Sequence, residues 1–262
     1  MTTAETNPAA QWSRLLVEAI SRPGLMLAAY SHFHNYSVGN QLLAFAQCSE
    51  RGIEPGPIAT FQTWKQRGRF VRKGEKALVL CMPMTFKSRD DKEKRVTLFA
   101  FKPRWFVLAQ TEGEEQPPVE LPEWSHTTAL DALGITETPF GMINGNVQGY
   151  ARQRSISISP IAAIPHKTRF HELAHVLLGH TAEADFSDGE ELTRDLREVE
   201  AECVALICCE SLGLTGAEFC RGYIQEWLGE RQEIPERSAQ RIFSAADAIL
   251  KAGVPQETAI AA

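Results

Sequence analysis

The segment RFHELAHVLLGH, residues 169–180, places His171 and His175 four residues apart, with Glu172 directly after the first histidine. In an α-helix, positions four apart differ by only about 40° around the axis, so both imidazoles project from one face. Two imidazole nitrogens can then bind one zinc ion, which also needs a third protein ligand and an open position for water. Zinc lowers the pKa of that water, and Glu172 is placed to accept its proton as a general base. The spacing therefore predicts a hydrolytic zinc site.

The neighbouring residues predict that this motif lies on a buried helix over residues 165–178. Pro165 suits a first helical turn, Gly179 suits the position just after a helix end, and apolar residues surround the two histidines. Because unpaired imidazoles and carboxylates are costly to bury, the three polar side chains of the motif require partners.

The third ligand decides the class of zinc site. In the pattern HExxHxxGxxH a third histidine follows a glycine, but here Leu178 and Thr181 occupy those two positions. His180 lies one residue too early, and we interpret it as a helix-end residue, a common place for a cation. A metzincin-type site is therefore excluded.

A later segment, LREVEAECVALICCESLG, supplies carboxylates at the start of an apolar helix. Glu198 and Glu202 share one face of that helix, while Glu200 points about 160° away from it. One of the first two can bind the metal while the other orients a ligand histidine.

HELAH followed by EVEAE, which begins 23 residues after His175, resembles the gluzincin pattern HExxH...ExxAD/E. The resemblance implies that Glu198 is the third zinc ligand and that Glu202 holds a ligand histidine. It also implies that the upstream segment RSISIS is the edge strand along which zincins hold an extended peptide by strand addition. The expected activity is that of a zinc-dependent metallopeptidase.

Charge is divided unevenly along the chain. Residues 1–110 contain 16 Lys and Arg against 8 Asp and Glu, whereas residues 111–262 contain 11 against 25. A basic half followed by an acidic half indicates two domains with different partners, and the basic half is a candidate for binding nucleic acid.

Within the basic half, the segment WKQRGRFVRKGEK interleaves cations with aromatic residues. Cations that follow phosphates, beside aromatic rings that stack on bases, are what single-stranded nucleic-acid binding requires, although such a run also suits a solvated hairpin. The predicted DNA-binding residues are Trp64, Lys65, Arg67, Arg69, Phe70, Arg72, Lys73 and Lys76.

The periodicity predicts an α+β fold. Helices at the N-terminus are followed by short strands: two around the KGEK turn, then VTLFAFK and RWFVLAQ, which form a small antiparallel sheet. The loop KSRDDKEKR separates the two pairs. An acidic, proline-rich linker over residues 112–124 separates a domain over 1–111 from a mostly helical zincin-like domain over 125–262, with an edge strand along its cleft.

The basic half resembles the N-terminal domain of ArdC-type antirestriction proteins at FHNYSVGNQLLAFAQC, FQTWKQRGRFVRKGEKALVLCMP and WFVLAQTEG. That family places a single-stranded DNA-binding domain before a zincin-like metallopeptidase domain, the order found here. The resemblance implies a zinc-dependent protein that binds single-stranded DNA, is associated with mobile elements and protects incoming DNA from restriction.

Two alternatives remain open at this stage. One is a regulatory metalloprotease similar to the ImmA/IrrE type, which cleaves a repressor or another protein partner. The other is a zinc ion that only holds the C-terminal domain together. The first residues form no signal-peptide pattern, no apolar run is long enough to span a membrane, and the cysteines form no CxxC pair, so a cytoplasmic protein with reduced thiols is expected.

Overall fold

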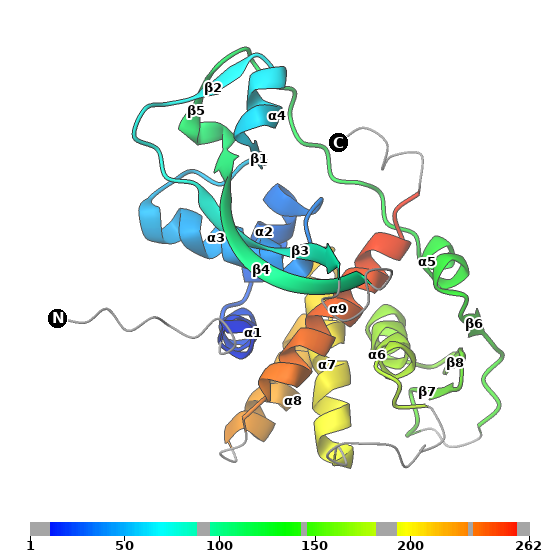
Figure 1. The fold of residues 1–262 in the computed structure, drawn as a ribbon. Helices are drawn as coiled ribbons and strands as arrows, with labels where there is room; N and C mark the ends of the chain where they lie inside the picture. Colours follow the sequence, from blue (N-terminus) through cyan, green and yellow to red (C-terminus); the bar gives the residue numbers. More distant parts are fainter. Residues whose placement is uncertain (1–10, 88–94, 143–145, 182–192, 230–232, 256–262) are drawn as a thin grey trace. The chain divides into compact units, whose positions relative to one another are not determined.

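A computed structural model describes residues 11–87, 95–142, 146–181, 193–229 and 233–255. The chain forms two compact units, one of Met1–Tyr30 with Leu121–Ala262 and one of Ser31–Glu120. Both combine helices with small sheets, so the predicted α+β class is confirmed (Figure 1). Within the described residues, no helix is both long enough and apolar enough to cross a membrane.

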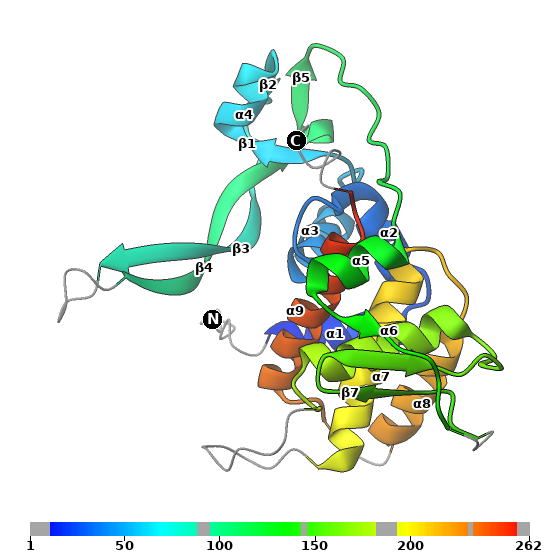
Figure 2. The ribbon, with the colours of Figure 1, turned by 90° about the vertical axis from the view of Figure 1, so that its right-hand side faces the viewer.

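The larger unit is mainly helical, and its central helix is α7 (Arg194–Ser211). This helix is buried on all sides from Val199 to Ser211, because α6, α8 and α9 all pack against it (Figure 2). A helix that is buried around its whole circumference belongs in a core, and in α7 the carboxylates of Glu200, Glu202 and Glu210 are buried together with the apolar residues. The other helices of the unit are α1 (Gln11–Ser21), α5 (His126–Leu133), α6 (Pro165–Leu177), α8 (Ala217–Gly229) and α9 (Glu236–Ala252). Helix α2 (Leu25–Phe33) crosses the boundary between the units.

The first helix belongs to the larger unit, which differs from the predicted domain over residues 1–111. Helix α1 packs against α7, α8 and α9. The backbone amides of Trp12 and Ser13 donate to the carboxylate of Glu236, at 3.2 and 2.9 Å, and Arg221 donates to the carbonyl of Ala19 at 3.3 Å. Such pairings join segments more than 200 residues apart, so local periodicity does not reveal them.

A three-stranded sheet lies beside α6 and has the order β6 (Thr136–Glu137), β8 (Ser155–Ile158), β7 (Gly149–Arg152). The predicted edge strand RSISIS is therefore the central strand, and the prediction was wrong on this point. The alternation of isoleucine with serine does not mark an exposed face here, because Ser157 is fully buried and its hydroxyl lies 2.7 Å from that of Thr138. Among the described residues β7 is an edge strand of this sheet, and it packs against α6.

The smaller unit is built around a long antiparallel hairpin of β3 (Leu78–Lys87) and β4 (Arg95–Val107). Strand β1 (Ile58–Thr60) pairs with the other side of β4, and β2 (Arg69–Val71) pairs with β5 (Thr111–Gly113). The two strands predicted around KGEK therefore do not pair with each other. The segments VTLFAFK and RWFVLAQ contribute to one continuous strand, β4, and most of the predicted loop KSRDDKEKR lies outside the described residues.

Helix α3 (Val38–Arg51) covers the open edge of β3. Asn40 exchanges two 2.8 Å hydrogen bonds with the backbone of Cys81, and Gln47 exchanges two 2.9 Å bonds with that of Val79. Two side-chain amides on one helix face thus satisfy backbone groups that an edge strand would otherwise leave unpaired. Helix α4 (Phe61–Gln66) follows β1 and leads into β2.

Candidate metal centre and candidate DNA surface

The two histidines of α6 and Glu198 of α7 converge on one point. The Nε2 atoms of His171 and His175 lie 3.0 Å apart. The Oε2 atom of Glu198 lies 3.4 Å from the first and 3.7 Å from the second. These are the three residues predicted to bind the metal, and the structure brings them together.

The spacing of these atoms fits a tetrahedral ion. Ligand atoms at 2.0–2.1 Å from a tetrahedral zinc ion lie about 3.3–3.4 Å from one another. The three separations bracket that value, and the donors are two imidazoles and one carboxylate, a set that suits zinc. The residues present therefore fit a single divalent cation with room for a further ligand.

Glu172 lines the same pocket, which has a volume of about 330 Å³. Its other walls include Tyr150 and Gly149 of β7. Glu172 is buried, and this burial raises the pKa of its carboxyl above the ordinary value, against the opposing charges of His171 and His175. A carboxylate with a raised pKa is a stronger base than an exposed one, as a general base requires.

Gly149 lets β7 approach α6 closely. A Cβ atom at this position would lie 2.7 Å from Cγ2 of Thr168, 3.1 Å from Oε1 of Glu172 and 3.1 Å from the carbonyl oxygen of Ser157. Only glycine leaves room for the side chain of the predicted base at this point of the strand.

Glu202 lies behind His171, as predicted. Its Oε1 atom is 3.1 Å from Nδ1 of His171 and accepts a hydrogen bond from Nζ of Lys167 at 2.6 Å. Burial alone would raise the pKa of Glu202, but the interaction with His171 lowers it to about 2. The carboxylate is therefore ionised and lies beside Nδ1 of His171, the ring nitrogen on the side away from the candidate metal site. Lys167 lies outside the HExxH motif, so the motif did not indicate its role. Its position one turn before His171 on α6 places the two residues on the same face of the helix.

The protonation of His171 follows from these partners. Burial alone would lower its pKa, but the neighbouring carboxylates of Glu198 and Glu202, at 3.4 and 3.1 Å, raise it to about 9. The imidazoles of the two histidines, beside the carboxylate of Glu198, hold its pKa well below the ordinary value. At neutral pH the site without metal is thus a pair of carboxylates around a protonated imidazole, and a cation that binds there must displace this proton.

His180 does more than end the helix. Gly179 has a φ of 74°, and this left-handed turn brings His180 back beneath α6, where its backbone amide donates to the carbonyl of His175 at 2.9 Å. Its Nδ1 lies 3.0 Å from Nδ1 of His175, and its Nε2 lies 2.9 Å from Oε2 of Glu200. Sequence reasoning missed both roles, because Glu200 points away from the metal face and only the turn at Gly179 connects it to the site.

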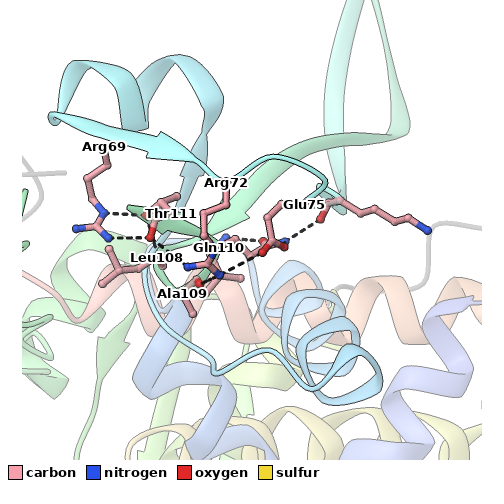
Figure 3. Close-up of polar contacts among 9 residues, drawn as sticks. Arg69, Arg72, Glu75, Leu108, Ala109, Gln110 and Thr111 are labelled. Atoms are coloured by element: carbon pink, nitrogen blue, oxygen red, sulfur yellow. Dashed lines mark hydrogen bonds and ion pairs between the residues drawn. The ribbon is translucent and has the colours of Figure 1, made fainter. Parts of the chain in front are cut away.

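The predicted DNA-binding residues fall into two groups. Arg69 and Arg72 stabilise the smaller unit itself (Figure 3). Nε of Arg69 donates to Oγ1 of Thr111 at 2.7 Å, and Nη2 donates to the carbonyl of the same residue at 3.0 Å. Arg72 pairs with Glu75 at 3.1 Å and donates to the carbonyl of Ala109. Arg69 thus holds β2 against β5, and Arg72 contacts the segment that leads into β5.

Trp64 corrects the prediction. Its side chain is completely buried and its Nε1 donates to the carbonyl of Phe106 at 2.8 Å, so it cannot stack on a base. Phe70, by contrast, is 53% exposed on β2. The remaining predicted cations are also exposed: Lys65, Arg67, Lys73 and Lys76.

Comparisons with known proteins agree with this architecture. Residues 3–121 match the family model for the N-terminal domain of anti-restriction factor ArdC. The fold is similar to that of the antirestriction ArdC protein from the R388 plasmid in its Mn(II)-bound structure, with a TM-score of 0.54 and 20% identity over 93% of this chain and 98% of that one. The metal-free structure of the same protein gives the same values. No match was found among the curated proteins.

The two findings overlap in the first half of the chain, and the structural similarity extends beyond it. The family model covers the basic half, including the smaller unit, and the structural similarity extends through the helices that carry the candidate metal site. We conclude that residues 3–121 form a domain of the ArdC N-terminal family and that the chain has a fold similar to that of an ArdC protein over most of its length.

Proposed function

We propose that this chain is a single-stranded DNA-binding, zinc-dependent protein of the antirestriction type, whose larger unit carries a gluzincin-like peptidase site. The observation that carries the peptidase part is the convergence of His171, His175 and Glu198 within 4.8 Å of one another, in the pocket that Glu172 lines. The comparisons support the antirestriction family and do not favour the alternative of a repressor-cleaving protease.

The proposed chemistry assigns one task to each residue. A bound zinc ion would lower the pKa of a water ligand and polarise a substrate carbonyl. His171, His175 and Glu198 would hold the ion, Lys167 and Glu202 would keep His171 oriented, and Glu172 would accept the proton of the attacking water and deliver it to the leaving amine. The free edge of β7, beside Glu172, offers backbone groups to which an extended peptide could add as a strand.

Zinc is proposed over manganese on the basis of the donor set. Two imidazoles with one carboxylate suit zinc, and sites of nitrogen and oxygen ligands bind zinc more tightly than manganese. The similar ArdC protein is described as Mn(II)-bound, so both ions are to be titrated into the metal-free protein. Tighter binding of Mn(II) than of Zn(II) would contradict the assignment.

Replacement of the base tests hydrolysis. Glu172→Gln should bind one ion per chain as the wild type does but lose cleavage of a quenched-fluorescence peptide library, because the amide cannot accept a proton. Glu226→Gln, an exposed position on α8, is the matched control. If the wild type binds the ion but cleaves no peptide or partner, the peptidase assignment fails while the metal site stands.

The DNA-binding part rests on the net positive charge of residues 1–110 and on exposed side chains of the smaller unit. Four exposed cations, Lys65, Arg67, Lys73 and Lys76, lie within a 12-residue segment that also contains the exposed ring of Phe70. Four phosphate contacts with a single strand predict that log K falls with log salt with a slope of about −3.

A gel-shift titration of single-stranded DNA at several salt concentrations measures that slope. Replacing Lys65 and Lys73 together by alanine should make it shallower by about 1.4, since each lost contact removes about 0.7. Lys251→Ala, an exposed lysine on α9, serves as the control. Absence of binding at low salt would contradict this part of the proposal.

A further inference from the structure

A chain of hydrogen bonds extends from His175 away from the candidate metal. It runs from Nδ1 of His175 to Nδ1 of His180 over 3.0 Å, and from Nε2 of His180 to Oε2 of Glu200 over 2.9 Å. The imidazole of His180 is 4% exposed and the side chain of Glu200 is fully buried. No step proposed above uses either residue.

We propose that His180 is a positioning residue that fixes the tautomer and orientation of His175, with Glu200 in turn fixing those of His180. The inference rests on the proposed metal site, because it assigns Nε2 of His175 as a ligand atom. It concerns the groups behind that ligand rather than the ligand itself.

The tautomers follow from the geometry. A ligand Nε2 carries no hydrogen, so the hydrogen of His175 must lie on Nδ1, which then donates to Nδ1 of His180. An accepting Nδ1 leaves the hydrogen of His180 on Nε2, which faces the carboxylate of Glu200. Each nitrogen in this series of hydrogen bonds is then either a donor or an acceptor. The lone pair on Nε2 of His175 points at His171 and Glu198.

Glu200 is itself held in place. Its Oε2 atom lies within hydrogen-bonding distance of Nε2 of His180, and Ser238 also hydrogen-bonds to this carboxylate. Nη1 of Arg241 lies 3.5 Å from Oε1 of Glu200. Arg241 also donates to the carbonyl of Leu178, close to the end of α6. A fully buried carboxylate with these partners stays ionised and is a fixed acceptor for His180.

The imidazole of His180 connects Glu200 to His175, which Glu200 does not contact directly. Glu200 lies about 160° around α7 from Glu202, so it cannot reach a ligand histidine from its own side of the helix. Glu202 contacts His171 directly, whereas His180 fills the gap between Glu200 and His175. Each ligand histidine thus has its own buried carboxylate, one direct and one through a second ring.

Three variants test the inference. His180→Phe keeps a ring of similar volume but removes the nitrogen that accepts from His175, and His180→Asn restores an acceptor oxygen near the position of that nitrogen. Glu200→Gln removes the charged acceptor behind His180. The dissociation constant for Zn²⁺ alone is measured by competition with a chromophoric chelator, and nitrogen-15 NMR of the zinc-loaded protein reports the tautomer of His175. Thermal unfolding of the metal-free proteins checks that each variant folds.

The loss of a group that orients a ligand typically weakens metal binding by about 10–100-fold. We expect a loss of this size in Zn²⁺ affinity for His180→Phe and a smaller loss for Glu200→Gln. For His180→Asn the affinity should recover to within about threefold of the wild type. In the wild type the NMR spectrum should place the hydrogen of His175 on Nδ1. A folded His180→Phe that binds Zn²⁺ like the wild type, or a His180→Asn that is as weak as His180→Phe, would overturn the inference. A wild type that binds no Zn²⁺ would instead refute the metal site itself.

Discussion

Substitution of Gly149 by alanine tests how tightly β7 is packed against α6. The new methyl carbon would lie 2.7 Å from Cγ2 of Thr168, whereas carbon atoms in contact are normally about 3.5–4.0 Å apart. The strand and the helix must therefore separate by about 1 Å. The carbonyl of Ser157, at 3.1 Å, prevents the strand from moving toward β8, so the displacement falls on α6 and on the carboxylate of Glu172.

The size of the effect follows from that displacement. Overpacking of this kind costs about 1–3 kcal/mol, which for a unit of this size corresponds to a fall of about 2–12 °C in the midpoint of thermal unfolding. A shift of about 1 Å in a catalytic group can reduce a rate by about 100-fold. Zinc binding should weaken less than the cleavage rate falls, because the three atoms nearest to the new methyl group belong to Thr168, Glu172 and Ser157 and not to the proposed ligands.

The matched control is Gly222→Ala on α8, where a Cβ atom would meet nothing within 4 Å. There alanine should be neutral or stabilising, since glycine is the poorer helix former by about 1 kcal/mol. Calorimetry, zinc titration and the peptide-cleavage assay are carried out on both variants. If Gly149→Ala unfolds at the temperature of the wild type and cleaves at its rate, the close approach of β7 to Glu172 is refuted.

Three further predictions concern the metal and the DNA surface. The carboxylates of Glu198 and Glu202 outweigh burial and raise the pKa of His171 to about 9 in the metal-free protein. Zinc binding at pH 7 should therefore release at least one proton, and the apparent affinity should weaken about tenfold per pH unit below pH 8. Calorimetry in buffers of different ionisation enthalpy that detects no release would contradict this. Apolar packing around α7 holds the larger unit together. Removal of the ion with a chelator should therefore abolish peptide cleavage and leave the far-ultraviolet circular dichroism spectrum unchanged. Unfolding on chelation would show instead that the metal is structural. Phe70→Ala should weaken single-stranded DNA binding by about 1–3 kcal/mol without loss of stability, because the ring of Phe70 is exposed. Trp64→Ala should instead destabilise the smaller unit by about 3–5 kcal/mol, because the ring of Trp64 is buried. The reverse pattern in gel-shift and unfolding assays would contradict the assignment of these two rings.

The residues that could be predicted are those whose geometry depends on one helix at a time. His171 and His175 share a face because helical periodicity determines it, and the same periodicity separates Glu198 and Glu202 from Glu200. The convergence of the two helices then required only that both bury their apolar sides. The spacing of the candidate ligand atoms agrees with that expectation.

The parts that could not be predicted depend on contacts distant in sequence. The burial of Trp64 depends on its pairing with the carbonyl of Phe106 in β4, and the position of β8 in the centre of its sheet depends on β6 and β7. The role of His180 depends on the left-handed turn at Gly179, which redirects a helix-end side chain beneath the preceding turn. None of these features has a periodic signal in the local sequence.

The side chains of His171, His175 and Glu198 are proposed to bind one divalent cation together. Anomalous diffraction at the zinc absorption edge, from crystals of the zinc-loaded protein, tests it most directly. We predict one strong peak per chain at about 2.0–2.2 Å from Nε2 of His171, Nε2 of His175 and a carboxylate oxygen of Glu198. A peak bound by other residues, or no peak at this site in the zinc-loaded protein, would contradict this assignment of the metal ligands.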